Sequence, residues 1–155
     1  MARVSDPTTV FSREILGVPE VGVTMLLADA AQVADQKLFV LGGGITAVGP
    51  RPQPVAIALV LSVPWDRANI SHQWSLELLT ADGRPVPGDT DALVVRGRFE
   101  AGRPAGLAPG SLLTVPLAIS FSTMPVVPGN SYVWQLRVEG HTRPEWQLPF
   151  HVRAA

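Results

Sequence analysis

The chain has 155 residues, the size of one domain, and 46% of them are hydrophobic. It has no cysteine, which excludes disulfides, thiolate zinc sites and cysteine nucleophiles, and its formal net charge of −1 argues against a nucleic-acid partner. Fourteen glycines and 15 prolines cut the sequence into short apolar runs without a sustained helical period. We therefore expect an all-β fold, an antiparallel two-sheet β-sandwich of about eight strands, Ig-like or C2-like.

Residues 1–20 are polar and mixed, so we predict a short N-terminal arm or strap there, followed by the sandwich domain at 21–155. The first residues lack the pattern of a signal peptide. The longest apolar stretch, Val55–Val63, is far shorter than the roughly 20 residues that a membrane helix needs. Together with the missing cysteines, these features predict a cytoplasmic protein of bacterial type without membrane insertion.

Glycine and proline separate the strands expected in the first half of the chain. A strand at 21–28 precedes an alanine-rich link at 29–36, for which we predict a helical turn or a loose hairpin loop. The next strand, Lys37–Leu41, runs into three glycines at 42–44, which predict a bulge or a sharp bend. Val55–Val63 is apolar at nearly every position, so we expect a central strand that is covered on both faces.

The second half of the chain alternates apolar and polar residues in the way of half-exposed strands. Further strands are expected at 72–81, 93–100, 112–122, 132–139 and 146–153. Pro116 interrupts one of them, which predicts an edge strand or a bulge, and Asp82–Gly83 predicts a turn. The aromatic side chains that we expect to meet in the core are Trp74, Phe99, Phe121, Trp134 and Phe150.

The candidates for catalysis and cofactor binding form no known pattern. The glycines at 42–44 lack the spacing of a phosphate-binding loop, and no serine lies in a nucleophile motif. The histidines His72, His141 and His151 lie in separate segments; only His141 and His151 are expected to approach each other, across a hairpin, and no carboxylates accompany them. We therefore predict a protein that is not an enzyme, with no catalytic residue, no metal site and no cofactor.

Acidic residues suggest one alternative function. Asp82, Asp89 and Asp91 lie in one loop, and a sandwich that binds calcium uses acidic loops at one end because the ion takes about six to eight oxygen ligands. In the other interpretation Asp82 forms the turn and the other two carboxylates are simply solvated. A small-ligand or calcium-binding sandwich is therefore the alternative.

The most individual local cluster is Trp65, Asp66, Asn69 and His72, between the end of one expected strand and the start of the next. Polar groups beside an indole at a strand end are typical of a binding rim. The same residues fit a packed corner, in which Asn69 and His72 satisfy backbone groups of the loop.

Several stretches are similar to an uncharacterised bacterial family of small all-β proteins, a domain of unknown function. They are Leu26–Ile45, Pro64–Val86, Gly102–Ile119 and Pro128–Gly140. The Pro-Trp-Asp corner and the Gly-Arg-Pro-x-Gly-Leu loop occur together and in order, and the likeness covers about 26–153. The resemblance implies a shared sandwich fold, and it brings no activity and no site residue, since none is assigned in that family.

Composition favours a module that binds another protein or associates with itself as a homo-oligomer. Only 16% of the residues are charged, against about 25% in an average domain. Some apolar surface is therefore expected to be covered by a partner or by a second copy, and the edge strands of a sandwich offer unpaired N–H and C=O groups. The charge-poor segment Leu112–Val127 is the candidate contact; alternatively, its side chains fill a larger core.

Overall fold

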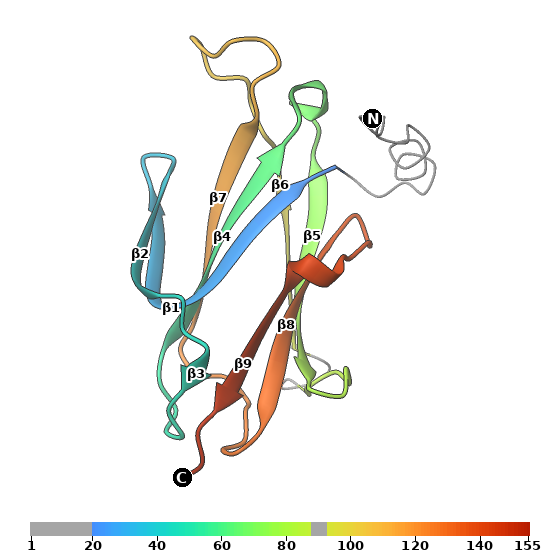
Figure 1. The fold of residues 1–155 in the computed structure, drawn as a ribbon. Coiled ribbons are helices and arrows are strands. Elements are labelled where there is room, and N and C mark those ends of the chain that lie inside the picture. The colour runs from blue at the N-terminus through green and yellow to red at the C-terminus, as the bar shows by residue number, and fades with distance from the viewer. Residues whose placement is uncertain (1–19, 88–92) are drawn as a thin grey trace, which may run out of the picture.

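The computed structural model describes residues 20–87 and 93–155, and these contain nine strands and two single-turn helices (Figure 1). The strands are β1 Gly22–Ala34, β2 Lys37–Gly43, β3 Ala47–Val48, β4 Val55–Val63, β5 His72–Thr80, β6 Val94–Phe99, β7 Leu113–Phe121, β8 Ser131–Val138 and β9 Gln147–Val152. The helices are η1 Trp65–Arg67 and η2 Pro144–Trp146. The expected all-β class is confirmed. The predicted arm at 1–20 lies outside the described residues, apart from Glu20.

The strands form two sheets. Sheet A has the order β2-β1-β4-β7, and sheet B has the order β3-β9-β8-β5-β6. Neighbouring strands are antiparallel except for β3 and β9, which are parallel. The strand count is thus nine rather than about eight, because a two-residue strand, β3, joins sheet B. In the described part of the chain, no helix is long and apolar enough to cross a membrane.

One hydrophobic core joins the two sheets. Alternation along β4 directs Ile57, Leu59 and Leu61 into this core, and all three are fully buried. They share the cluster with Trp134 and Leu136 of β8, which are also fully buried. On the other face of β4, Ala56 and Ala58 are buried, and Val60 and Ser62 are half-buried. The prediction of a central strand covered on both faces is confirmed.

The five predicted core aromatics all belong to this region. Trp74, Phe99, Trp134 and Phe150 are buried. Phe121 is partly buried and stacks on Trp134 with ring centroids 4.9 Å apart. Because each of these rings lies at an inward position of an alternating strand, the period of two was sufficient to find them.

The alanine-rich link at 29–36 is neither a helical turn nor a loose loop, and that prediction is wrong. β1 continues to Ala34 and pairs with β2 through a two-residue turn. Asp35 and Gln36 have φ of 50° and 57°, as in a type I′ hairpin turn. Strand pairing outweighs the helical preference of alanine here, since propensity is only a weak prior.

The register shows that the β1–β2 hairpin folds back along sheet A. β1 pairs with β4 over its first half and with β2 over its second half. Across β4, Gly22 lies level with Thr114, and Ala28 lies level with Ser120. If β1 were straight, Val33 would lie beyond the level of Ser120 and far from Thr114. Val33 and Thr114 nevertheless line the same pocket, so β1 bends back. β2 accordingly contacts β4 and β7, and Figure 1 shows the hairpin turned up beside them.

The glycines at 42–44 form the predicted bend. The N–H groups of Gly44 and Ile45 both donate to the carbonyl of Leu27, at 2.9 and 3.0 Å, which is the two-against-one pattern of a bulge. Gly42 and Gly44 have positive φ, which glycine adopts without strain. Pro116 lies on β7, the outer strand of sheet A, so its missing N–H costs no pairing at that edge, as predicted.

Truncation of a buried leucine tests how much the core between the two sheets contributes to the free energy of unfolding. Leu59→Ala should lower the free energy of unfolding by about 2–5 kcal/mol, because it leaves a cavity between the sheets. Chemical denaturation measures this loss. Leu112→Ala removes the same atoms from a side chain that is 66% exposed, and it should cost less than about 0.5 kcal/mol. Equal losses in the two variants would contradict the assigned core.

Candidate functional site

The predicted rim residue Trp65 begins η1 and is held by Arg103. The Arg103 Nε and Nη2 groups donate to the carbonyl of Trp65 at 3.2 and 2.7 Å. The same guanidinium lies over the indole, 4.8 Å from the ring centroid, in a cation–π contact. Asp66 next to it is exposed.

The other two residues of the predicted rim point elsewhere. Asn69 has φ of 59° and donates its backbone N–H to the carbonyl of Ala101 at 2.8 Å. The His72 side chain is buried, stacks on Phe99 at 5.1 Å between ring centroids and lies 3.6 Å from a carboxylate oxygen of Glu139. Trp65 therefore packs in the loop around Arg103, whereas His72 lies on the core-facing side of β5 in sheet B. The binding role of the cluster stays a prediction.

The other candidate ligands of a metal are spread over the fold. His151 is paired with Ser131 at the start of β8, and its Nδ1 is 2.8 Å from the Ser131 hydroxyl oxygen. His141 follows the other end of β8, so the expected approach of the two histidines across the hairpin is wrong. Across residues 20–87 and 93–155, no three His, Cys, Asp or Glu side chains are placed to hold a metal ion.

The acidic loop is described only at its beginning. Asp82 lies in the turn after β5, where the N–H of Gly83 donates to the carbonyl of Thr80 at 2.9 Å, so the turn predicted there is confirmed. Asp89 and Asp91 lie outside the described residues.

Three consecutive exposed apolar side chains lie on β2, the free strand of the hairpin. Phe39 is 55% exposed, Val40 37% and Leu41 71%. β2 pairs with β1 and with no other described strand, so one side of its backbone is open. We call Lys37–Leu41 with this open backbone the β2 edge. The sequence pattern predicts this strand but not its exposure, which depends on the fold-back of the hairpin.

The other three sheet edges carry features that discourage pairing with another chain. The outer strand β7 contains Pro116. In sheet B, β3 has two residues, and β6 carries Arg96 and Arg98. The β2 edge has neither proline nor a short length, and its single charge is Lys37. It is the unprotected edge among those described.

The segment predicted as a contact, Leu112–Val127, divides into two parts. Along β7 the alternate side chains Val115, Leu117 and Ile119 pack against the core. At the two ends of the segment, Leu112 is 66% and Val127 58% exposed. The side chains of β7 thus pack against the core, whereas those at the two ends of the segment are exposed.

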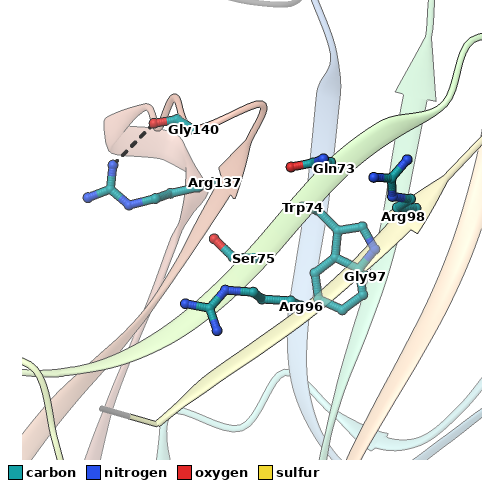
Figure 2. A pocket seen from close by; sticks show the side chains of 8 residues that line it. All are labelled: Gln73, Trp74, Ser75, Arg96, Gly97, Arg98, Arg137 and Gly140. Carbon is teal, nitrogen blue, oxygen red and sulfur yellow. Dashed lines mark hydrogen bonds between the residues drawn. The ribbon is translucent and has the colours of Figure 1, made fainter. Parts of the chain in front are cut away.

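A pocket of about 400 Å³ lies on sheet B (Figure 2). Arg96 of β6, Ser75 of β5 and Arg137 of β8 are direct neighbours across three strands. Arg98 lies two residues further along β6, opposite Gln73. We call these five residues the arginine pocket. Figure 2 shows Arg96 and Arg137 on the two sides of Ser75.

Trp74 and Gly97 also line this pocket. They are direct neighbours on β5 and β6, and a Cβ atom at position 97 would stand 2.7 Å from two carbons of the indole. Only glycine leaves room there for the buried ring. The close packing fixes β6 beside β5 and thereby sets the positions of the flanking Arg96 and Arg98.

The model of a family of unknown function, DUF6941, matches residues 23–153, which is most of the chain. No curated protein and no solved structure matches the chain.

Replacement of Gly97 tests the packing beneath the pocket. Gly97→Ala should destabilise the fold by about 1–3 kcal/mol, because the added methyl group overlaps the Trp74 ring. Denaturation followed by tryptophan fluorescence measures the change. Gly102→Ala is the matched control, since no heavy atom lies within 4 Å of the new Cβ. A Gly97 variant as stable as this control would contradict the close approach.

Proposed function

Because the chain belongs to DUF6941, a family of unknown function, its role has to be argued from its own surface, and we propose that it is a non-enzymatic module that self-associates through the β2 edge. The observation that carries this proposal is the run of exposed apolar side chains on the one unprotected strand. Pairing of edge strands uses main-chain hydrogen bonds and hydrophobic contact at the same time. The Ig-like or C2-like arrangement of the sheets is part of this proposal, supported by their shared core.

The backbone geometry defines which groups are available. Ala34 and Lys37 flank the two-residue turn and therefore form a hydrogen-bonded pair. By alternation, Phe39 and Leu41 also direct their backbone groups toward β1. Leu38 and Val40 direct their N–H and C=O groups away from β1, toward solvent. Gly42 has φ of 62° and ends the regular edge.

A second copy fits these groups in one antiparallel register. When Phe39 lies opposite Phe39 of the second copy, Leu38 of each copy pairs with Val40 of the other and exchanges both hydrogen bonds. The two phenyl rings then form a cross-strand pair at a position without backbone bonds, where side chains are closest. Lys37 lies opposite Leu41, which its alkyl stem can cover.

The occupant that fits this edge best is the chain itself. The strand is self-complementary around Phe39, as its apolar residues are distributed on both sides of that position. A formal net charge of −1 creates little repulsion between two copies. Pairing would join the two A sheets into one continuous sheet and cover the most exposed apolar residues of β2.

Charge at the centre of this register should break the dimer. Phe39→Lys places two like charges directly opposite each other, so association should weaken at least about tenfold, or about 1.4 kcal/mol. Sedimentation equilibrium over a wide concentration range measures the dissociation constant. Because Phe39 is 55% exposed, the variant should fold, and circular dichroism checks this.

Two further variants sharpen the test. Val40→Pro removes the N–H donor that faces the second copy while leaving the bonds to β1, and it should also give a monomer. Ser120→Lys introduces the same charge as Phe39→Lys on the exposed face of β7, the opposite edge of sheet A, and should leave the dimer unchanged. A monomeric unmodified protein, or equal weakening by Ser120→Lys, would contradict the proposal. In the first case an extended segment of another protein becomes the occupant to test.

A further inference from the structure

We propose that the arginine pocket binds the phosphate group of a small soluble molecule, either a phosphate monoester or free phosphate. The pocket lies on sheet B, whereas the β2 edge belongs to sheet A. This inference therefore does not depend on self-association.

The register places the three arginines on one face of sheet B around Ser75. In Figure 2 the Arg137 side chain reaches toward Gly140, and that of Arg98 points away from Ser75. Arg96, Ser75 and Arg137 stand in one row across β6, β5 and β8. Because adjacent strands are about 4.8 Å apart, the Cα atoms of the two arginines are roughly 10 Å from each other. Arg98 stands about 7 Å from Arg96 along the same strand. Side chains of this length can meet over the Ser75 hydroxyl.

These cations have no acidic partner in the described part of the chain. None of the three guanidinium groups lies within 4.0 Å of a described carboxylate. Arg96 and Arg98 make no side-chain hydrogen bond there, and Arg137 donates to the Gly140 carbonyl at 3.5 Å and to Gln135 Oε1 at 3.3 Å.

The nearby described carboxylates make no ion pair with these arginines. Glu139 accepts the backbone N–H of Gln73 at 3.0 Å and approaches His72. Glu77 follows Ser75 on the same face of β5 and makes no ion pair with the arginines. An anion from solution would supply the missing charge.

Protection of a sheet edge does not account for the whole arrangement. Charges on β6 are expected at an edge strand, because they discourage pairing with another chain. β8, however, lies inside sheet B between β9 and β5. Arg137 is half-buried there, and it stands across Ser75 from Arg96 on the same face of the sheet.

The number of donors favours phosphate over a carboxylate. Each guanidinium has five N–H donors in a planar fork, and the Ser75 hydroxyl adds another. A carboxylate offers two oxygens, whereas a phosphate group offers three or more to forks that arrive from different sides. The volume of about 400 Å³ is at the lower end of ligand sites, which suits a small molecule.

Titration of the full chain with inorganic phosphate and with phenyl phosphate tests the proposal. Amide NMR signals of Ser75 and Gly97 should shift and saturate with both probes. Arg96→Gln and Arg137→Gln should each weaken binding at least about tenfold, because each removes charge-assisted hydrogen bonds. Arg67→Gln, which changes an exposed arginine of η1, should leave the affinity unchanged.

Three outcomes would overturn the proposal. The first is that neither inorganic phosphate nor phenyl phosphate gives a saturable shift of the amide signals in the unmodified protein. The second is an equal loss of affinity in Arg67→Gln, which would show an effect of overall charge alone. The third is binding to vesicles of phosphatidic acid and phosphatidylcholine without binding to the soluble probes, which would assign the surface to a membrane.

Discussion

Burial of β4 on both faces is the constraint on which the rest of the structure depends. One face meets the aromatic and leucine side chains of sheet B, which gives the two sheets a common core. The other face carries small residues such as Ala56 and Ala58, which are also buried. A strand of this kind needs cover from two directions. Sheet B supplies one cover, and the turn in β1 brings the hairpin back against sheet A, where β2 contacts β4.

The same turn leaves β2 at the outside of the molecule. A hairpin that covers its own sheet ends with a free strand, and here that strand is apolar on both faces. The remaining edges carry a proline, arginines or only two residues. The fold-back of the hairpin therefore has two consequences: β2 contacts β4, and the other edge of β2 stays unpaired.

Sequence patterns located most strands but not their spatial relations. Alternation placed Trp74 and Phe99 in the core, and the proline rule placed Pro116 at an edge, because both depend on a few neighbouring residues. The β1–β2 hairpin was not predicted, since Asp35 and Gln36 are not the usual Asn-Gly or Asp-Gly of a type I′ turn. The exposure of Phe39 depends on the fold-back of this hairpin along sheet A, which no local sequence pattern indicates.

The arginine pocket illustrates the same limit. Arg96 and Arg137 are 41 positions apart in the sequence (137 − 96), and only the registers of β5 with β6 and with β8 bring both to Ser75. A one-residue slip in either pairing would turn one arginine to the other face of the sheet. Single-sequence reasoning has no access to such registers, so scattered arginines looked like ordinary surface charge. The sequence groups His72 with Trp65, and the alternation of β5 turns the His72 side chain toward the core.

The sequence contains a single lysine, Lys37, and it stands at the first position of β2, next to the hairpin turn. The only side-chain amine of this sequence is thus placed on the strand with the open backbone. Acylation, methylation or any other amine-directed chemistry on a side chain is consequently confined to that one location. Acetylation there would remove the one charge of the strand and leave an entirely uncharged apolar ribbon at the surface.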